Sequence, residues 1–431
     1  MFATISNIFK VADLRQKIVF TLLMLVVFRI GTFIPVPNVN ADALNFQDQA
    51  NAFAMLSIFG GGALENFSIF AMGIMPYITA SIIVQLLTMD VVPKFAQWAR
   101  EGEAGKRKLA QVTRYGTIVL GFIQAFGMSI GFNNLFPGLI QNATFGTYLF
   151  ITLVLTAGTA FLMWLGEMIT EKGIGNGISI LIFAGIVAAF PSGANQFYMQ
   201  EAQKVAEGSP LFLSIIYGVI LVLVLIAIIV GVIFIQQGIR KIPVQYAKRV
   251  VGRKMYGGQS THIPLKVNAA GVIPVIFAMS LLMFPSTIAS FWAGNRFADW
   301  ITTNFSYDSA FGMFFYILLI IGFTYFYTFV QMNPMQMAEN MKKNGGYIPG
   351  IRPGKTTSIY LTRILNRITL TGALFLAAVS VLPFIISRIG ELPPQVQIGG
   401  TALLIVVGVA LDTMKQINSQ LIKRHYKGFI K

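Results

Sequence analysis

The most constraining feature of this chain is its succession of apolar stretches. We distinguish ten of them, near residues 18–37, 68–89, 112–133, 147–168, 177–191, 211–236, 267–286, 310–332, 368–388 and 397–412. A helix of about 20 mostly apolar residues is long enough to cross a bilayer; the fifth stretch is short and ends at Pro191. Only 11% of the 431 residues are charged and 55% are hydrophobic, which is unlike a soluble protein of this length. The sequence therefore predicts an all-α membrane protein with ten transmembrane helices.

The distribution of Lys and Arg predicts how these helices cross the membrane. Of the 32 basic residues, 28 fall in the two ends and in alternate connections, including residues 237–266 and 333–367. Because basic residues collect in cytoplasmic loops, both termini are expected on the cytoplasmic side. The first apolar stretch is too long for the core of a cleavable signal, so we expect it to remain as an anchor.

One decapeptide pattern occurs in both halves of the chain. Residues 71–80 (AMGIMPYITA) return 198 residues later as 269–278 (AAGVIPVIFA). The charges direct the two helices that carry these copies in opposite directions, and ten helices divide into two units of five, an odd number that inverts the second unit. We therefore expect two inverted five-helix halves, residues 1–200 and 201–431, with a working site where the copies meet.

The chain offers little to catalysis or to metal binding. It contains no cysteine, and its two histidines, His262 and His425, lie in basic polar stretches. A thiolate nucleophile is thus excluded, and a zinc site within the membrane has no obvious source of ligands. Residues 350–357 (GIRPGKTT) contain the G-K-T of a phosphate-binding loop, but the first glycine of that motif would fall at Pro349. Nucleotide binding at this segment is therefore not expected. We expect no catalytic residue, no metal and no cofactor; the energy for any work would come from a partner or an ion gradient.

Several polar or irregular segments admit two interpretations. Arg29 can snorkel toward the outer face or bond backbone carbonyls, and Glu167 can be interfacial or buried. Gln85 and Asn268 lie on the two helices with the repeated pattern, where a hydrogen bond between them would form a weak latch of about 1 kcal/mol. Residues 55–67 (MLSIFGGGALENF) are either an interfacial amphipathic segment or a short plug between the halves.

The connections 237–266 and 333–367 are longer than membrane orientation requires. The first carries seven basic residues and no acidic residue. Such a protruding positive surface suits an acidic protein, ribosomal RNA or anionic lipid, and the sequence leaves these three alternatives open.

Motifs along the whole chain resemble the SecY/Sec61 family, the large subunits of protein-translocation channels. They comprise residues 28–37 (FRIGTFIPVP), 73–78 (GIMPYI), 164–167 (WLGE), 173–179 (GIGNGIS), 259–262 (QSTH), 266–274 (KVNAAGVIP) and 349–354 (PGIRPG). Their order and spacing match bacterial members, and a Gram-positive source is favoured. The resemblance implies an hourglass channel in the bacterial plasma membrane. It would pass unfolded secretory polypeptides across the membrane and release transmembrane segments sideways into lipid through a lateral gate.

The resemblance also implies roles for individual residues. A pore ring would consist of Ile74, Ile78, Ile178, Ile182, Ile276 and Ile405. The plug would consist of Met55, Leu56, Ser57, Ile58, Phe59, Gly60, Gly61, Gly62, Ala63, Leu64, Glu65, Asn66 and Phe67. The lateral gate would be lined by Thr79, Gln85, Asn268 and Phe284. A motor or ribosome would dock on Arg352, with Lys248, Arg249, Arg253 and Lys254 as further candidates.

The implied partners are the small subunits SecE and SecG, the SecA ATPase, the ribosome, signal sequences, unfolded preproteins and membrane lipids. A secondary transporter of a small solute is the runner-up function, because such transporters also use inverted repeats. It should place polar coordinating groups at the midplane, where this chain has isoleucines. A membrane enzyme ranks third, since the apolar stretches contain no histidine, cysteine or paired aspartates.

Overall fold

The computed structural model describes most of the chain. The described residues are 11–40, 44, 60–88, 92–206, 210–246, 249–251, 254–256, 260–289, 295–305, 309–390 and 401–427. Each predicted apolar stretch overlaps a helix of this described part. In chain order these helices are α2 (Ala12–Gly31), α4 (Met75–Leu87), α6 (Glu103–Leu135), α7 (Phe145–Lys172), α8 (Gly177–Ala206), α9 (Leu211–Gln237), α10 (Ile273–Ala289), α12 (Ala310–Gln331), α14 (Lys355–Gly390) and α15 (Thr401–Lys427). Shorter helices between them are α5 (Pro93–Arg100), α11 (Arg296–Asn304) and α13 (Pro334–Lys343).

The helices have the length and surface of membrane spans. Within the described residues, seven helices are long and apolar enough to cross a membrane, and α4 and α10 are shorter apolar helices. Much of this apolar surface faces outward: α9 exposes Phe212, Val219, Leu223 and Phe234, among others. A helix that is apolar on every side and not covered by protein is suited to contact with lipid. The framework is that of a multi-pass membrane protein.

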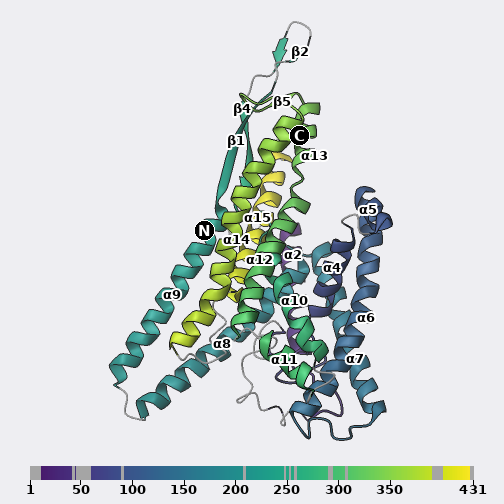
Figure 1. Ribbon diagram of the computed structural model, residues 1–431, viewed down its shortest axis with the longest axis vertical. Helices are drawn as coiled ribbons and strands as arrows, with labels where there is room; N and C mark the ends of the chain where they lie inside the picture. Colours follow the sequence, from purple (N-terminus) through teal and green to yellow (C-terminus); the bar gives the residue numbers. More distant parts are fainter. Residues whose placement is uncertain are drawn as a thin grey trace.

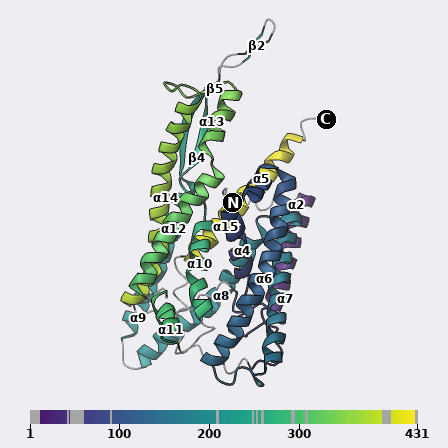
Figure 2. The ribbon, with the colours of Figure 1, turned by 45° about the vertical axis from the view of Figure 1, so that its right-hand side comes forward.

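Two groups of helices meet along α4 and α10. Helix α6 packs against α4 and α7, whereas α12 packs against α10 and α14. Figures 1 and 2 show α4, α6 and α7 on one side of the molecule and α9, α12 and α14 on the other, with α10 between them. Because α10 also contacts α4 and α6, buried side chains of both groups form one continuous hydrophobic cluster.

Helix α8 is longer than the sequence indicates. The expected end at Pro191 is wrong, because the helix continues through this residue to Ala206. Proline removes one backbone donor from a helix, and the adjacent Ser192 hydroxyl donates to the Ala189 carbonyl at 2.8 Å within the same turn. The expected boundary between the two halves, at residue 200, falls inside this helix.

The connection 237–266 is a sheet, which corrects the all-α prediction for this part of the chain. Strands β1 (Ile239–Tyr246) and β4 (Ser260–Lys266) pair antiparallel, with Ile239 opposite Lys266. Strand β5 (Gly346–Tyr347), from the connection 333–367, pairs with the other edge of β1. The short strands β2 (Arg249–Val251) and β3 (Lys254–Tyr256) form a hairpin at the far tip in Figure 1. We call β1–β5 and α13 the extension.

The extension has a hydrophobic core of its own. Along β1, Ile242 and Val244 are buried while the residues beside them are exposed, the alternation expected of a strand with one covered face. These side chains pack with Leu265 of β4, Met341 of α13 and Leu361 of α14. The two long basic connections therefore form one packed unit rather than two separate loops.

Candidate pore constriction and gate

The two copies of the decapeptide adopt the same local structure. Gly73 and Gly271, at matching positions, both have a positive φ, 56° and 66°, which glycine adopts without the steric cost of a side chain. Helices α4 and α10 then begin two residues later, at Met75 and Ile273. Proline is the second residue of each helix, where its missing N–H costs no helical hydrogen bond. For the first copy this turn delays the helix: Ser68 forms a β-bridge with Pro35 and residues 69–74 are turns, where the sequence predicts the start of a span.

The helices that follow the two turns touch each other. The Ser280 hydroxyl of α10 donates to the Ile276 carbonyl at 3.0 Å and lies 3.7 Å from the Met75 sulfur of α4. Ser280 is buried, as are Met279 and Ile78 in the same contact region. The two halves of the chain are thus joined at the repeated pattern itself.

The structure brings the six predicted ring isoleucines into one cluster. Five of them are buried and Ile178 is half-buried against the others. Ile74, Ile78, Ile182 and Ile276 line a void of about 20 Å³, together with Gly60, Met72, Gly73, Met75 and Met279. This volume is close to the minimum that holds a single water molecule, and all of the lining side chains are apolar. Ile405 and Ile178 belong to the cluster but do not line the void.

The predicted plug is described only in its second part. Residues 55–59 lie outside the described residues, and Gly60–Phe67 form a series of turns. Ala63, Leu64 and Phe67 are fully buried, and Gly60 reaches the void between the isoleucines. The far end is fixed by backbone bonds: the Val36 N–H donates to the Phe67 carbonyl and the Ile69 N–H to the Ile34 carbonyl, both at 3.0 Å.

Arg29 makes a specific contact with this segment. Of its two interpretations, the structure favours the second, since the guanidinium Nη1 donates to the backbone carbonyl of Gly61. Its Cζ also lies 4.7 Å from the centre of the Phe33 ring, a distance typical of a cation–π contact.

The predicted gate residues lie on α4 and α10 or just before α10, but the amide latch is wrong. Gln85 Nε2 donates to the Ser81 hydroxyl of its own helix at 3.5 Å, and Asn268 Nδ2 donates to the Gly271 carbonyl at 3.0 Å. Both amide oxygens are buried without a hydrogen-bond partner in the described part of the chain. Thr79, also buried, donates to the Met75 carbonyl at 3.1 Å. Each amide thus donates to an acceptor of its own segment, which sequence spacing could not reveal. Phe284 is half-buried on α10.

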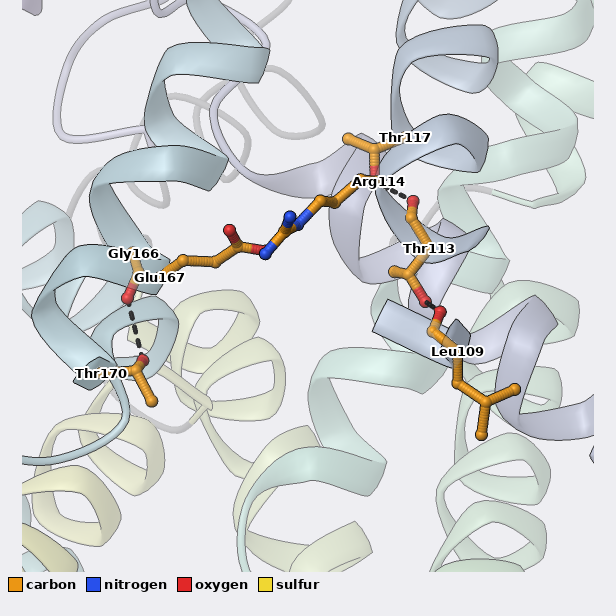
Figure 3. A network of polar contacts seen from close by, with 7 residues as sticks. All are labelled: Leu109, Thr113, Arg114, Thr117, Gly166, Glu167 and Thr170. Atoms are coloured by element: carbon orange, nitrogen blue, oxygen red, sulfur yellow. Dashed lines mark hydrogen bonds and ion pairs between the residues drawn. The ribbon is translucent and has the colours of Figure 1, made fainter. Parts of the chain in front are cut away.

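Glu167 forms an ion pair that sequence inspection missed. Figure 3 shows Glu167 of α7 facing Arg114 of α6, and the Nε–Oε1 distance is 2.8 Å. The Glu167 side chain is 29% exposed and that of Arg114 is 50% exposed, so Glu167 is not fully buried within the protein. Such a pair contributes only about 0–1 kcal/mol. One turn further along α7, the Thr170 hydroxyl donates to the Gly166 carbonyl and accepts from the Gly177 N–H, both at 2.8 Å, which joins α7 to the start of α8.

Three of the predicted docking residues are described, and they lie in or directly beside the extension. Arg352 is exposed between β5 and α14, and its carbonyl accepts a hydrogen bond from the Thr357 hydroxyl at 2.9 Å. Gly350 and Gly354, on either side, have positive φ values of 79° and 108°, so the backbone around Arg352 is a defined turn. The backbone of Arg249 and Lys254 lies in the β2–β3 hairpin. Lys248 and Arg253 lie outside the described residues.

Comparison with known proteins identifies the family of the chain. The SecY family model matches residues 68–414. The protein translocase subunit SecY of Halalkalibacterium halodurans is 69% identical over 432 residues, covering all of both chains. The chain belongs to the SecY family. This relative's Gram-positive group agrees with the source that the sequence favours.

Solved structures share the SecY-family fold. One, described as showing that the SecY plug domain stabilises the closed state of the translocation channel, superposes with a TM-score of 0.67, 20% identity and coverage of 97% and 95% of the two chains. Another, Sec61 in the canine ribosome–channel complex, has a TM-score of 0.64, 17% identity and the same coverage. At these identities the likeness establishes the fold.

Proposed function

We propose that this chain is the protein-conducting subunit of a translocase in the plasma membrane. It passes unfolded secretory polypeptides across the bilayer and releases transmembrane segments sideways into lipid. The observation that carries this proposal is the small apolar void where the two copies of the repeat meet, lined by isoleucines from both. The name and full-length identity of the Halalkalibacterium halodurans relative support it.

The apolar ring explains how one opening can be both tight and unselective. Isoleucine is β-branched and stiff at χ1, so a ring of such side chains keeps its shape. A constriction lined by apolar side chains gates by dewetting and resists ions. It also offers no polar group that would hold one polypeptide sequence more tightly than another. The pore ring proposed for this chain is Ile74, Ile78, Ile178, Ile182, Ile276 and Ile405.

The lateral gate is proposed between α4 and α10. Their contact is formed by side-chain packing and one hydroxyl–sulfur contact, and Gln85 and Asn268 are not bonded to each other. Helices that are held together mainly by side-chain packing can exchange their mutual contact for an apolar signal sequence. The buried, unpartnered amide oxygens of Gln85 and Asn268 would be satisfied once the gate parts and admits water or peptide groups.

The extension is the proposed docking surface, and it is proposed to be cytoplasmic, as are both termini. Its basic residues, with Arg352 foremost, would bind the SecA ATPase or the ribosome, and SecE and SecG would complete the complex. Arginine presents a planar fork that pairs with a carboxylate or phosphate through two parallel hydrogen bonds, which lysine does not reproduce. In this assembly the hydrolysis of ATP belongs to SecA, and this chain is a channel subunit rather than an enzyme. The secondary-transporter alternative receives no support from the relatives.

Reconstitution tests the proposed function directly. The chain is co-purified with SecE, incorporated into vesicles and supplied with SecA, ATP and a precursor that carries a signal sequence. We expect ATP-dependent appearance of precursor fragments protected from added protease, and no protection without SecA. Failure of a well-assembled complex to protect any precursor would contradict the proposal.

A further inference from the structure

Arg29 is a charged residue in the last turn of an apolar helix. It is flanked by Phe28 and Ile30 and is itself half-buried. A charge at this place in a membrane-spanning helix is costly unless it finds polar partners. Its observed partners are the Gly61 carbonyl and the face of Phe33, so the guanidinium is held between α2 and the plug segment.

Gly61 is a point where three parts of the chain meet. It has a positive φ of 69°, and a Cβ added to it would lie 3.2 Å from the Gly185 Cα of α8 and 3.6 Å from the Phe28 ring. The same Cβ would lie 3.7 Å from the Arg29 Nη1. The backbone of the plug segment is therefore seated closely against both α2 and α8. Gly60, the preceding residue, lines the void between the isoleucines.

The two ends of the described plug segment are attached in different ways. The end at Phe67 is joined to residues 34–36 by backbone hydrogen bonds and an antiparallel bridge between Pro35 and Ser68. The end at Gly61 is held by a side chain, the guanidinium of Arg29. A backbone pairing makes a fixed hinge, whereas a single charge-assisted side-chain bond can break and reform without disturbing the helices.

We propose that Arg29 is the latch that holds the plug segment in its closed position. An entering polypeptide displaces Gly60 from the constriction and moves the adjacent Gly61, which breaks the Arg29–Gly61 hydrogen bond while the hinge at Phe67 stays in place. The guanidinium remains stacked on Phe33 and rebonds Gly61 when the channel empties. This inference rests on the proposed function and adds to it a residue that sets the balance between closed and open states.

The test compares Arg29→Gln and Arg29→Lys with the unaltered chain in the complex with its small subunits. A hydrogen bond to a charged group contributes about 1.5–3 kcal/mol, so its loss in Arg29→Gln should raise the resting ion conductance in planar bilayers about 10-fold to 100-fold. Arg29→Lys keeps the charge but loses the fork, and an intermediate rise is expected. Arg15→Gln is the matched control, because Arg15 is exposed near the other end of the same helix. The resting conductance of this variant should equal that of the unaltered chain.

A second readout follows the plug itself. The sequence contains no cysteine, so Ala63→Cys introduces a single thiol at a side chain that is 0% exposed. A membrane-impermeant maleimide should label it about tenfold faster or more when Arg29→Gln is added. Labelling reports plug displacement even in a variant whose conductance is hard to record.

The outcomes separate the latch from the proposed function. The double variant Ile78→Ser/Ile276→Ser serves as the positive control for a conducting pore. If it leaks while Arg29→Gln changes neither conductance nor labelling, the latch is refuted and the channel stands. If the serine variant also fails to conduct, both the isoleucine constriction and the latch are refuted, and the reconstituted export assay decides the proposed channel function separately.

Discussion

The two copies of the decapeptide have the same backbone conformation at their glycine, but different hydrogen bonds stabilise the two turns. In the first copy, the turn before α4 is held by backbone bonds, with the Gly73 N–H donating to the Phe70 carbonyl at 2.8 Å. In the second, a side chain holds it, since Asn268 donates to the Gly271 carbonyl. The first turn continues back into the plug segment, and the second follows directly on β4 of the extension. The same pattern thus begins two helices in the same way, one preceded by the plug segment and the other by the extension.

The two copies therefore combine one local structure with different flanking segments. The matching helix starts bring Ile78 and Ile276 to equivalent positions around one void, which suits a symmetric seal. The flanks are free to diverge, because the positive φ of the glycine and the proline that follows specify the turn locally. We propose that the first flank closes the channel and the second receives the motor.

The largest effect is expected at the extension. Arg352→Glu reverses the charge at the proposed docking turn, and it should reduce ATP-driven export of a secreted precursor by about 100-fold or more, because a repelled charge pair replaces an attractive one. Insertion of this chain into the membrane should be unaffected. Export is measured as protease-protected precursor in vesicles. Lys355→Glu, an exposed change of the same charge three residues away, is the control, and an equal loss there would argue against a specific role for Arg352.

The next effect concerns the seal. Ile78→Ser and Ile276→Ser each place a hydroxyl in the void, where water gains a hydrogen-bond partner and dewetting is weakened. We expect each single variant to raise resting conductance about tenfold and the double variant to raise it further. If only one of the two variants raises the resting conductance, the two copies do not contribute equally to the seal. If neither does, Ile78 and Ile276 do not form the constriction.

The smallest effect concerns the two glycines. A Cβ at Gly73 would meet only the Gly60 Cα, at 3.8 Å, and at Gly271 nothing lies within 4 Å. Alanine is therefore opposed by the positive φ rather than by space, at a cost of about 1–2 kcal/mol. Gly73→Ala and Gly271→Ala should lower the Tm of the purified complex by similar amounts, measured by intrinsic fluorescence. A neutral result at only one position would mean that its turn relaxes and that the local equivalence is incomplete.

Much of the framework could be predicted because it depends on local patterns. Apolar stretches set the positions of the helices, since the bilayer demands about 20 apolar residues per span. The glycine and proline of the decapeptide specified its turn without reference to the rest of the chain. The first strand of the extension carried a short signal too, because Ile242 and Val244 are spaced two residues apart between Lys241 and Gln245, but two positions are too few to predict a strand.

The contacts that could not be predicted depend on distances between segments that are remote in the chain. Gln85 and Asn268 lie in the two stretches predicted to face each other, yet Gln85 donates to Ser81 and Asn268 donates to Gly271, each within its own segment. Arg114 and Glu167 are 53 residues apart, and nothing in their spacing marks them as partners. The contact between Arg29 and Gly61 likewise depends on how the plug segment is seated against α2 and α8.

Hydropathy, charge and glycine–proline turns act over a few residues, so a helical membrane protein with a repeated pattern and a basic surface could be predicted from the amino-acid order. The packing of remote segments, by contrast, fixes which isoleucines share one void, which carbonyl Arg29 binds, and that two basic connections contribute strands to one sheet. Packing and directional hydrogen bonds depend on distances of a few ångströms, and these are set only when distant segments of the chain come together.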